Sequence, residues 1–204
     1  MLFINKYSVY LQLHFKNKIT MEIKISTKQM LKVLYVLSWI IFIGVCTEAG
    51  GIIVNAFVTL VLKPANAQYF WKEIDLSALY KYDPGYFFVE TLLMSIVAIM
   101  RACLFYLIVK ILHDNKLNLT KPFNKEMGRF MFNVSYLALG LGMFSYWGVK
   151  YTGWLTAQMV KMPDIQYLRL GGADVWLFMG VTLYVIAQIF KKGIEIQEEN
   201  DLTV

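Results

Sequence analysis

Four ionisable side chains lie within or beside long apolar stretches of this sequence. Arg101 lies in the middle of AIMRACLF, and Glu48 lies in the first apolar stretch. An unpaired cation at the centre of a bilayer costs roughly 2.5–3.5 kcal/mol on insertion scales, so Arg101 needs a partner. Side chains lean toward the N-terminus of their own helix, which brings Glu48 and Arg101 toward each other on consecutive spans. We therefore predict an intramembrane Glu48–Arg101 charge pair, with either a structural role or a role in transport or sensing.

Two further carboxylates have a simpler interpretation. Glu90 and Asp174 each lie near the expected start of a helix, where a negative charge interacts favourably with the helix dipole. Glu90 also lies three helical turns from Arg101, so both would face the interior of a helix bundle. We keep Glu90 and Asp174 as additional intramembrane or interfacial charges.

The sequence contains no pattern typical of an enzyme, a cofactor site or a metal site. The aspartates of intramembrane aspartyl proteases have partial counterparts at Asp83 and Asp174, but Asp83 falls in a loop and Ala173 replaces a motif glycine. Nucleophile and phosphate-loop signatures are missing. Cys46 and Cys103 fall in different apolar stretches, and no Cys/His spacing suggests a metal. We expect no catalytic activity, cofactor or metal.

The elements that must position these charges are long helices. The chain is 58% hydrophobic and 17% charged, which is too apolar for an ordinary soluble domain of this size. Apolar stretches of about 20 residues are long enough to cross a bilayer as helices. We predict an all-α polytopic membrane protein, a four-transmembrane-helix bundle. Its parts are an N-terminal segment (1–30), a transmembrane domain (31–190) with spans at about 31–62, 87–111, 130–151 and 173–190, and an acidic tail (191–204).

The basic residues predict the orientation of the bundle. The N-terminal segment, the second loop and the tail carry 13 Lys and Arg residues, whereas the first and third loops carry six. The positive-inside rule then places both termini in the cytoplasm. The net charge of +6 is scattered over short loops, so we expect no direct binding of nucleic acid. Met21 precedes a basic segment and is an alternative translation start.

Three local patterns predict details of the bundle. Aromatic and charged residues mix over Tyr69–Tyr86, which suits a short helix on the outer membrane surface. Asp83, Pro84 and Gly85 form a turn into the second span. Close helix packing is expected along a stripe of small residues on the third span. The stripe consists of Ser135, Ala138, Gly142 and Ser145.

The end of the chain resembles a known family. Two patterns are similar to the bacterial membrane family catalogued as domain of unknown function 2975. The first is an apolar last span followed by Gly193 and then Ile196–Val204. The second is the string Thr120–Asn124 in the second loop. The resemblance implies a protein of the bacterial cytoplasmic (inner) membrane, often encoded beside a small helix-turn-helix transcription regulator. We therefore hypothesise a regulatory or sensory protein that holds this partner in the cytoplasm. The predicted partner-binding residues are Pro122, Phe123, Glu198, Glu199, Asp201 and Leu202.

A transporter is the alternative function. Four spans are few for a secondary transporter acting alone, although a homodimer would compensate. Glu48 and the adjacent Gly50–Gly51 pair interrupt the first span like a broken helix. The alternative is therefore a small homo-oligomeric transporter, or an accessory subunit of one, that uses Glu48 and Arg101.

Overall fold

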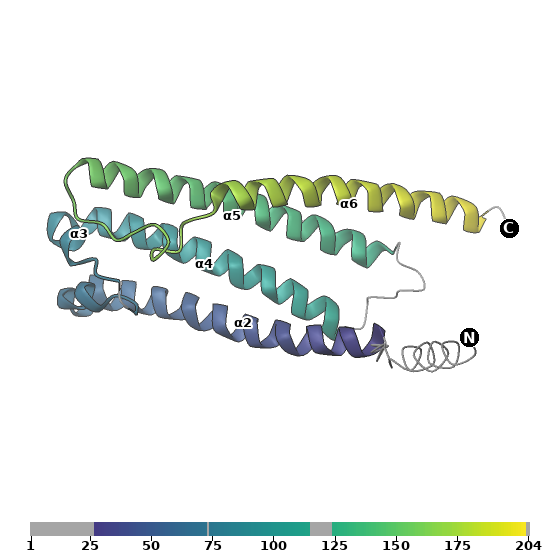
Figure 1. The fold of residues 1–204 in the computed structure, drawn as a ribbon, viewed down its shortest axis with the longest axis horizontal. Helices are drawn as coiled ribbons and strands as arrows, with labels where there is room; N and C mark the ends of the chain where they lie inside the picture. The colour runs from purple at the N-terminus through teal and green to yellow at the C-terminus, as the bar shows by residue number, and fades with distance from the viewer. Residues whose placement is uncertain (1–26, 73, 115–123, 203–204) are drawn as a thin grey trace, which may run out of the picture. The chain divides into compact units, whose positions relative to one another are not determined.

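The computed structural model describes residues 27–72, 74–114 and 124–202. The chain divides into two compact units, Met1–Val33 and Leu34–Val204, and the second unit contains the packed helices. The elements are α2 (Thr27–Phe57), the π-helical turn η1 (Val58–Leu62), the 3-10 helix η2 (Pro64–Tyr69), α3 (Ser77–Tyr82), α4 (Pro84–His113), α5 (Lys125–Ala157) and α6 (Ala173–Leu202) (Figure 1).

The all-helical class is confirmed for the described residues, where a Trp71–Ile74 β-bridge is the only extended pairing. Three helical stretches there are long and apolar enough to cross a membrane: Gln29–Leu62, Pro84–His113 and Ala173–Asn200. This is what a membrane protein requires. α5 has 33 residues, which is also long enough, but it is less apolar and is not among these candidates. The fourth span and the cytoplasmic termini therefore stay predictions.

Helix α5 packs along α4 on one side and α6 on the other, and each pair is antiparallel (Figure 1). The order of the contacts along α5 and α6 shows that these two helices run in opposite directions. A Cβ added at Gly128 of α5 would lie 3.2 Å from Ile194, near the end of α6, whereas one at Gly148 would lie 2.8 Å from Leu170, just before α6 begins. These three helices form the part of the fold to which the other segments attach.

Small residues allow α5 and α6 to approach closely. A Cβ at Gly142 would lie 2.6 Å from Leu177 Cγ and 2.9 Å from the Leu177 backbone nitrogen. A Cβ at Gly180 of α6 would likewise lie 2.8 Å from the Leu139 nitrogen. Ser135 Oγ donates a hydrogen bond across the interface to the Gly180 carbonyl at 3.0 Å. The predicted small-residue packing stripe is confirmed, and its members Ser135, Ala138, Gly142 and Ser145 are all buried.

The segment between η1 and α3, residues 63–76, folds back along α2. The ring of Trp71 packs directly on Gly51, which lies about 16 Å before the end of η1 at 1.5 Å per residue. Asn66 Nδ2 donates to Asn55 Oδ1 of α2 at 3.0 Å. The apolar side chains of this region are buried in the core: Phe70, Ile74, Leu76 and Leu79. The predicted helix on the membrane surface is therefore corrected. Within the predicted stretch, α3 is an α-helix, and the segment before it buries Phe70, Ile74 and Leu76 while Tyr69 stays exposed.

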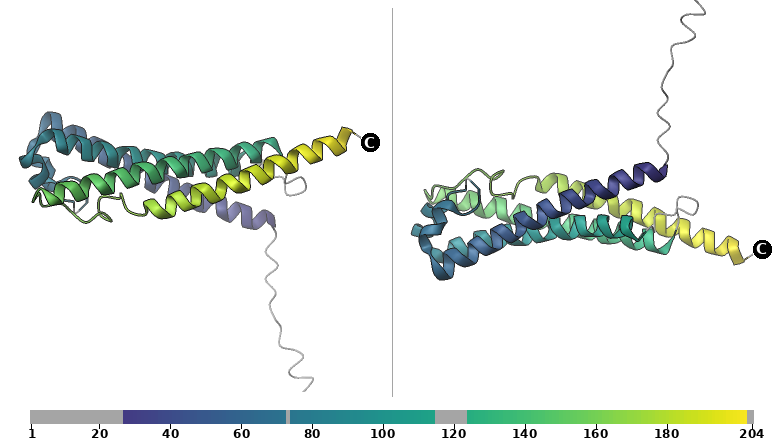
Figure 2. Two further views of the ribbon diagram at one scale, coloured as in Figure 1. Left: turned by 90° about the horizontal axis from the view of Figure 1, so that it is seen from above. Right: turned by 90° about the horizontal axis from the view of Figure 1, so that it is seen from below.

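The segment between α5 and α6, residues 158–172, also folds back (Figure 1, Figure 2). Leu170 packs on Gly148 of α5, about 14 Å before the end of that helix. Leu168 and Leu170 are fully buried, which explains why the segment follows the bundle and does not extend into solvent. Both connecting segments at this end of the bundle, which we call the loop end, thus contribute to the core.

The predicted turn into the second long helix is confirmed. Asp83 is the N-cap of α4, and its Oδ1 accepts hydrogen bonds from the backbone nitrogens of Gly85 (2.6 Å) and Tyr86 (3.0 Å). Pro84 occupies the first helical turn, where its missing N–H costs nothing. The cap fixes the point at which α4 enters the bundle.

The C-terminal residues continue α6 without a break. The sequence placed the end of the last span at 190 and a separate tail from 191, but α6 runs to Leu202. Lys192 and Glu195 form an i,i+3 ion pair at 3.2 Å within this part, which supports the helix modestly. Residues 191–202 are therefore the last part of a helix that starts near the loop end.

Replacing Gly142 by alanine should destabilise the bundle. The added Cβ meets the backbone of Leu177, which cannot rotate away, so we expect a loss of about 1–3 kcal/mol. The measurement is thermal unfolding in detergent. The control is Gly153→Ala on the same helix, where a Cβ has nothing within 4 Å, and which should be neutral or slightly stabilising. Equal effects of both substitutions would contradict the close α5–α6 contact.

Candidate functional site

Three charged side chains from separate parts of the chain meet at Arg169. The Arg169 Nε lies 3.3 Å from Glu48 Oε1 of α2 and forms an ion pair with it. The Nη2 of Arg101, on α4, donates a hydrogen bond to the Arg169 carbonyl oxygen at 2.7 Å. We call Glu48, Arg101 and Arg169 the arginine cluster. It joins two apolar helices to the segment that leads into α6.

The arginine cluster corrects the predicted direct pair of Glu48 with Arg101. Among the described residues, the ion-pair partner of Glu48 is Arg169, although Glu48 still interacts electrostatically with Arg101. One N–H group of Arg101 donates to a carbonyl oxygen. A guanidinium has five N–H donors and accepts a neutral partner readily. The expectation that Arg101 needs a partner was right, whereas the identity of the partner was wrong.

Backbone turns hold Arg169 in this position. Hydrogen bonds run from the Leu168 nitrogen to the Asp164 carbonyl at 3.1 Å and from the Arg169 nitrogen to the Gln166 carbonyl at 3.2 Å. Arg169 has a φ of 60°, a left-handed conformation that a residue with a side chain adopts at a cost. The two buried leucines that flank it anchor the turn, so the cost of this conformation is offset by burial.

The arginine cluster is partly exposed at the protein surface. The side chain of Arg169 is 46% exposed and that of Glu48 22%. Charges among apolar helices normally face the bundle interior or a water-filled cavity, and Arg169 lines a cavity at the loop end. Of the three members of the cluster, Arg169 thus borders a cavity.

Sequence reasoning missed Arg169 because it counted this residue as one of the loop charges that set orientation. A signal was present in the sequence. Arg169 is flanked by Leu168 and Leu170, and an apolar, charged, apolar alternation is unusual for a solvated loop. That alternation indicates a segment with one face packed on protein.

Glu90 forms a second buried polar contact, apart from the arginine cluster. Its side chain is fully buried, and its Oε1 accepts a hydrogen bond from Thr152 Oγ1 of α5 at 2.7 Å. Its Oε2 has no partner among the described residues. The prediction that Glu90 faces the bundle interior is confirmed. It lies about 16 Å from Arg101 along α4 and contacts none of the cluster.

Asp174 lies where the sequence placed it, in the first turn of α6. It is exposed and belongs to neither buried polar group. A carboxylate in the first helical turn interacts favourably with the N-terminal dipole, so its position is explained without any contact to Arg101.

Glu198 and Glu199, the two predicted partner-binding residues whose side chains the structure describes, lie at the other end of the bundle, which we call the tail end. Glu198 Oε1 of α6 pairs with Lys125 Nζ of α5 at 2.8 Å, and both side chains are exposed. Glu199 is also exposed. Pro122 and Phe123 lie outside the described residues. Asp201 and Leu202 belong to α6, but their side chains lie outside the described ones.

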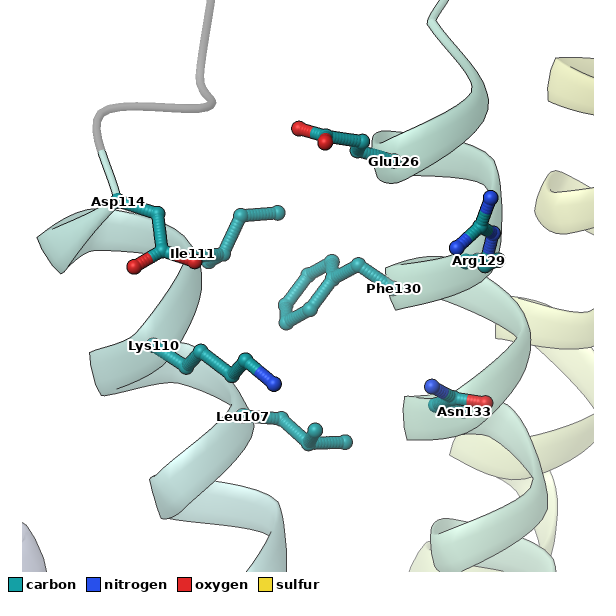
Figure 3. Close-up of a pocket in the computed structure, with 8 residues that line it drawn as sticks. All are labelled: Leu107, Lys110, Ile111, Asp114, Glu126, Arg129, Phe130 and Asn133. Atoms are coloured by element: carbon teal, nitrogen blue, oxygen red, sulfur yellow. The ribbon is translucent and has the colours of Figure 1, made fainter.

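A small cavity of about 230 Å³ lies at the tail end between α4 and α5. Figure 3 shows Lys110 of α4 and Glu126 of α5 extending toward the space between the two helices, with the ring of Phe130 between them. Asp114, just after α4, and Arg129 of α5 also line the cavity. The lining of the cavity therefore combines charges of both signs with the apolar side chains of Leu107, Ile111 and Phe130. Its lining residues Asp114 and Glu126 lie in sequence on either side of the second loop, which contains two of the predicted partner-binding residues.

Comparison with known proteins identifies one family. A family model described as "Protein of unknown function (DUF2975)" matches residues 62–204. The match includes α4, α5, α6 and both inward-folding segments, and so includes Arg101 and Arg169 but not Glu48. No curated protein and no solved structure matches the chain.

Exchanging the charges of Glu48 and Arg169 should restore stability that either reversal alone removes. Glu48→Arg places three cations together. It should lower the free energy of unfolding by about 1–2 kcal/mol, which lies between the losses expected from breaking an exposed and a buried ion pair. Adding Arg169→Glu should recover part of this loss, measured as the unfolding temperature in detergent. The control pairs Glu48→Arg with Arg101→Glu and should recover less. Equal or better recovery in the control would favour a direct Glu48–Arg101 pair.

Thr152→Val should destabilise the bundle by about 1–3 kcal/mol, because it removes the hydroxyl that donates to Glu90 and leaves a buried carboxyl group without that partner. Thr152→Ser keeps the hydroxyl and should retain most of the stability. Unfolding temperatures of the two variants in detergent test this. If serine is as harmful as valine, the hydrogen bond is not what matters at this position.

Proposed function

The chain belongs to the family described as Protein of unknown function (DUF2975), as its resemblance predicted, and from this premise we propose that it is a regulatory or sensory protein of the bacterial cytoplasmic membrane. In this proposal it has four spans and cytoplasmic termini. It engages a small helix-turn-helix transcription regulator through its second loop and the end of α6.

The packing of α5 supports a fourth span. α5 contacts α4 and α6, both of which are long and apolar enough to cross a membrane. A Cβ at Gly140 of α5 would lie 2.5 Å from Met100 of α4, and Gly180 of α6 packs on Leu139. The middle of α5 thus lies beside the middle of α4 and beside the apolar first half of α6, so a bilayer that contains those parts would contain the middle of α5 as well.

The observation that carries the proposal is the direct connection of the arginine cluster to the tail end. The segment with Arg169 leads into α6, and α6 continues as one helix to the Lys125–Glu198 ion pair. A helix moves largely as a rigid body, so a shift at the loop end can be transmitted to its other end by sliding against α5. This arrangement suits a protein that converts a signal at the loop end into a change at the tail end.

The tail end has suitable chemistry for a basic partner. Glu195, Glu198 and Glu199 are carboxylates on the last turns of α6. A DNA-binding surface is basic and would compete with Lys125 for Glu198, since an exposed ion pair contributes only about 0–1 kcal/mol. The regulator would then be held away from DNA while it is bound to α6.

Transport is a second candidate, favoured by one observation. Residues 158–172 bring irregular backbone beside the charges on apolar helices, and membrane proteins tolerate such backbone where it is buried or lines a water-filled cavity. In a transporter, Glu48→Gln or Arg101→Met would abolish substrate movement in a protein that still inserts. In a regulator, the same variants would alter partner binding.

Removing the carboxylates at the end of α6 should release the partner. We expect crosslinking and affinity capture of the full-length protein from its native membrane to recover a helix-turn-helix protein. The double variant Glu198→Gln with Glu199→Gln should recover roughly tenfold less, since each carboxylate would make a charge-assisted contact. Recovered proteins are identified by mass spectrometry.

The matched control for this experiment is Asp174→Asn, which removes an exposed carboxylate from the opposite end of the same helix and should leave recovery unchanged. A version that ends at Lys192 should behave like the double variant. If no DNA-binding protein depends on the end of α6, the regulatory proposal fails and transport becomes the function to test.

A further inference from the structure

A large cavity lies at the loop end between the two inward-folding segments. Its volume is about 900 Å³, and it is lined by residues of 63–76 on one side and of 158–172 on the other. This volume is within the range of pockets that hold small organic ligands. Arg169 lines it, so the cavity borders the arginine cluster.

Two cations in unusual backbone conformations line this cavity. Lys72 has a φ of 52° and Arg169 a φ of 60°, and Met159 is the third non-glycine residue with positive φ among the described residues. One cation comes from each inward-folding segment. Left-handed conformations of residues with side chains concentrate where a ligand or a function requires them. The shared location of Lys72 and Arg169 thus indicates a site for negative charge.

The remaining polar groups of the cavity support an anion. The indole nitrogen of Trp71 is a buried donor with no acceptor among the described residues, and Trp71 lines the cavity. Lys72 is exposed and forms no ion pair within the described part of the chain. Among the described residues of the lining, Asp164 is the carboxylate, and its Oδ1 accepts a hydrogen bond from the Gln166 nitrogen at 2.8 Å. The described lining residues therefore include two cations and one carboxylate, and Arg169 is also paired with Glu48.

The cavity is also suited to an apolar body. The rings of Trp71 and Tyr167 and the side chain of Ile74 contribute to its lining, and aromatic side chains bury large apolar areas against a ligand. Cationic groups beside aromatic rings are the combination that recognises an anionic head joined to a ring or chain.

We propose that this cavity binds an organic anion, in which a phosphate or carboxylate group is joined to an aromatic or apolar body. The anion contacts Lys72 and Arg169, and the body packs on the rings of Trp71 and Tyr167. The same chemistry is offered by a soluble small molecule and by the headgroup of an anionic lipid. The idea that this ligand is the signal rests on the regulatory function proposed above. The binding of the ligand to the cavity is independent of that function.

The test uses the full-length protein in nanodiscs of phosphatidylcholine, with naphthyl phosphate as the soluble probe. Binding is followed by unfolding temperature and tryptophan fluorescence. Naphthol and inorganic phosphate serve as partial probes that lack the anion or the body. In a second arm, phosphatidylglycerol replaces part of the phosphatidylcholine and no soluble probe is added.

The variants separate the site from general charge effects. Lys72→Asn removes the cation but keeps a residue that tolerates left-handed backbone. It should weaken naphthyl phosphate binding roughly tenfold or more, as expected for loss of a charge-assisted hydrogen bond. Lys161→Asn, an exposed lysine of 158–172 that does not line the cavity, should bind like the unmodified protein.

The outcomes decide both the site and the source of its ligand. Binding of naphthyl phosphate that depends on Lys72 supports a soluble anion, and stabilisation by phosphatidylglycerol with the same dependence supports a lipid headgroup. The proposal is overturned if neither probe binds, if Lys72→Asn and Lys161→Asn weaken binding equally, or if naphthol binds as tightly as naphthyl phosphate. Partner capture by the end of α6 is measured separately, so a failure here leaves the regulatory function standing.

Discussion

The hydrogen-bonding requirement of Arg101 shapes the loop end of this protein. A guanidinium on an apolar helix must find acceptors inside the protein, because lipid supplies none. Here the acceptor is the carbonyl oxygen of Arg169, and the side chain of Arg169 in turn pairs with Glu48. Arg169, a residue of a connecting segment, thus accepts a hydrogen bond from Arg101 through its carbonyl oxygen. Its side chain also forms an ion pair with Glu48. This requires residues 158–172 to lie along the bundle.

The rest of the packing is consistent with that requirement. Gly148 leaves room for Leu170, and Gly51 leaves room for the ring of Trp71, so both inward-folding segments can lie against helices without steric conflict. Gly142 and Gly180 hold α5 and α6 close together. The glycines therefore occur where another segment must approach a backbone closely, which is a common reason for small residues in membrane bundles.

The arrangement separates two kinds of chemistry at the two ends of α6. The loop end combines cations, aromatic rings and a large cavity. The tail end carries acidic residues, one of which pairs with Lys125. Because α6 is one uninterrupted helix between them, the two ends are mechanically connected. A receptor that relays a signal across a membrane needs such a connection between a binding site and a partner-binding surface.

Local signals in the sequence were sufficient for some features. The long apolar stretches predicted the helices, Asp83–Gly85 predicted the start of α4, and the stripe of small residues predicted the α5–α6 contact. The terminal residues and the Thr120–Asn124 string together predicted the family. Each of these features depends on residues close together in sequence, where periodicity, capping and length have direct physical meaning.

Tertiary structure alone decided the partners of the charges. That Arg101 needs an acceptor follows from its apolar surroundings, but which group supplies it depends on how residues 158–172 return along α5. Glu90 likewise required a partner, and only packing brought Thr152 to it. Hydrogen bonds and ion pairs between distant segments depend on distances of a few ångströms, and the sequence determines these only through the complete packing of the chain.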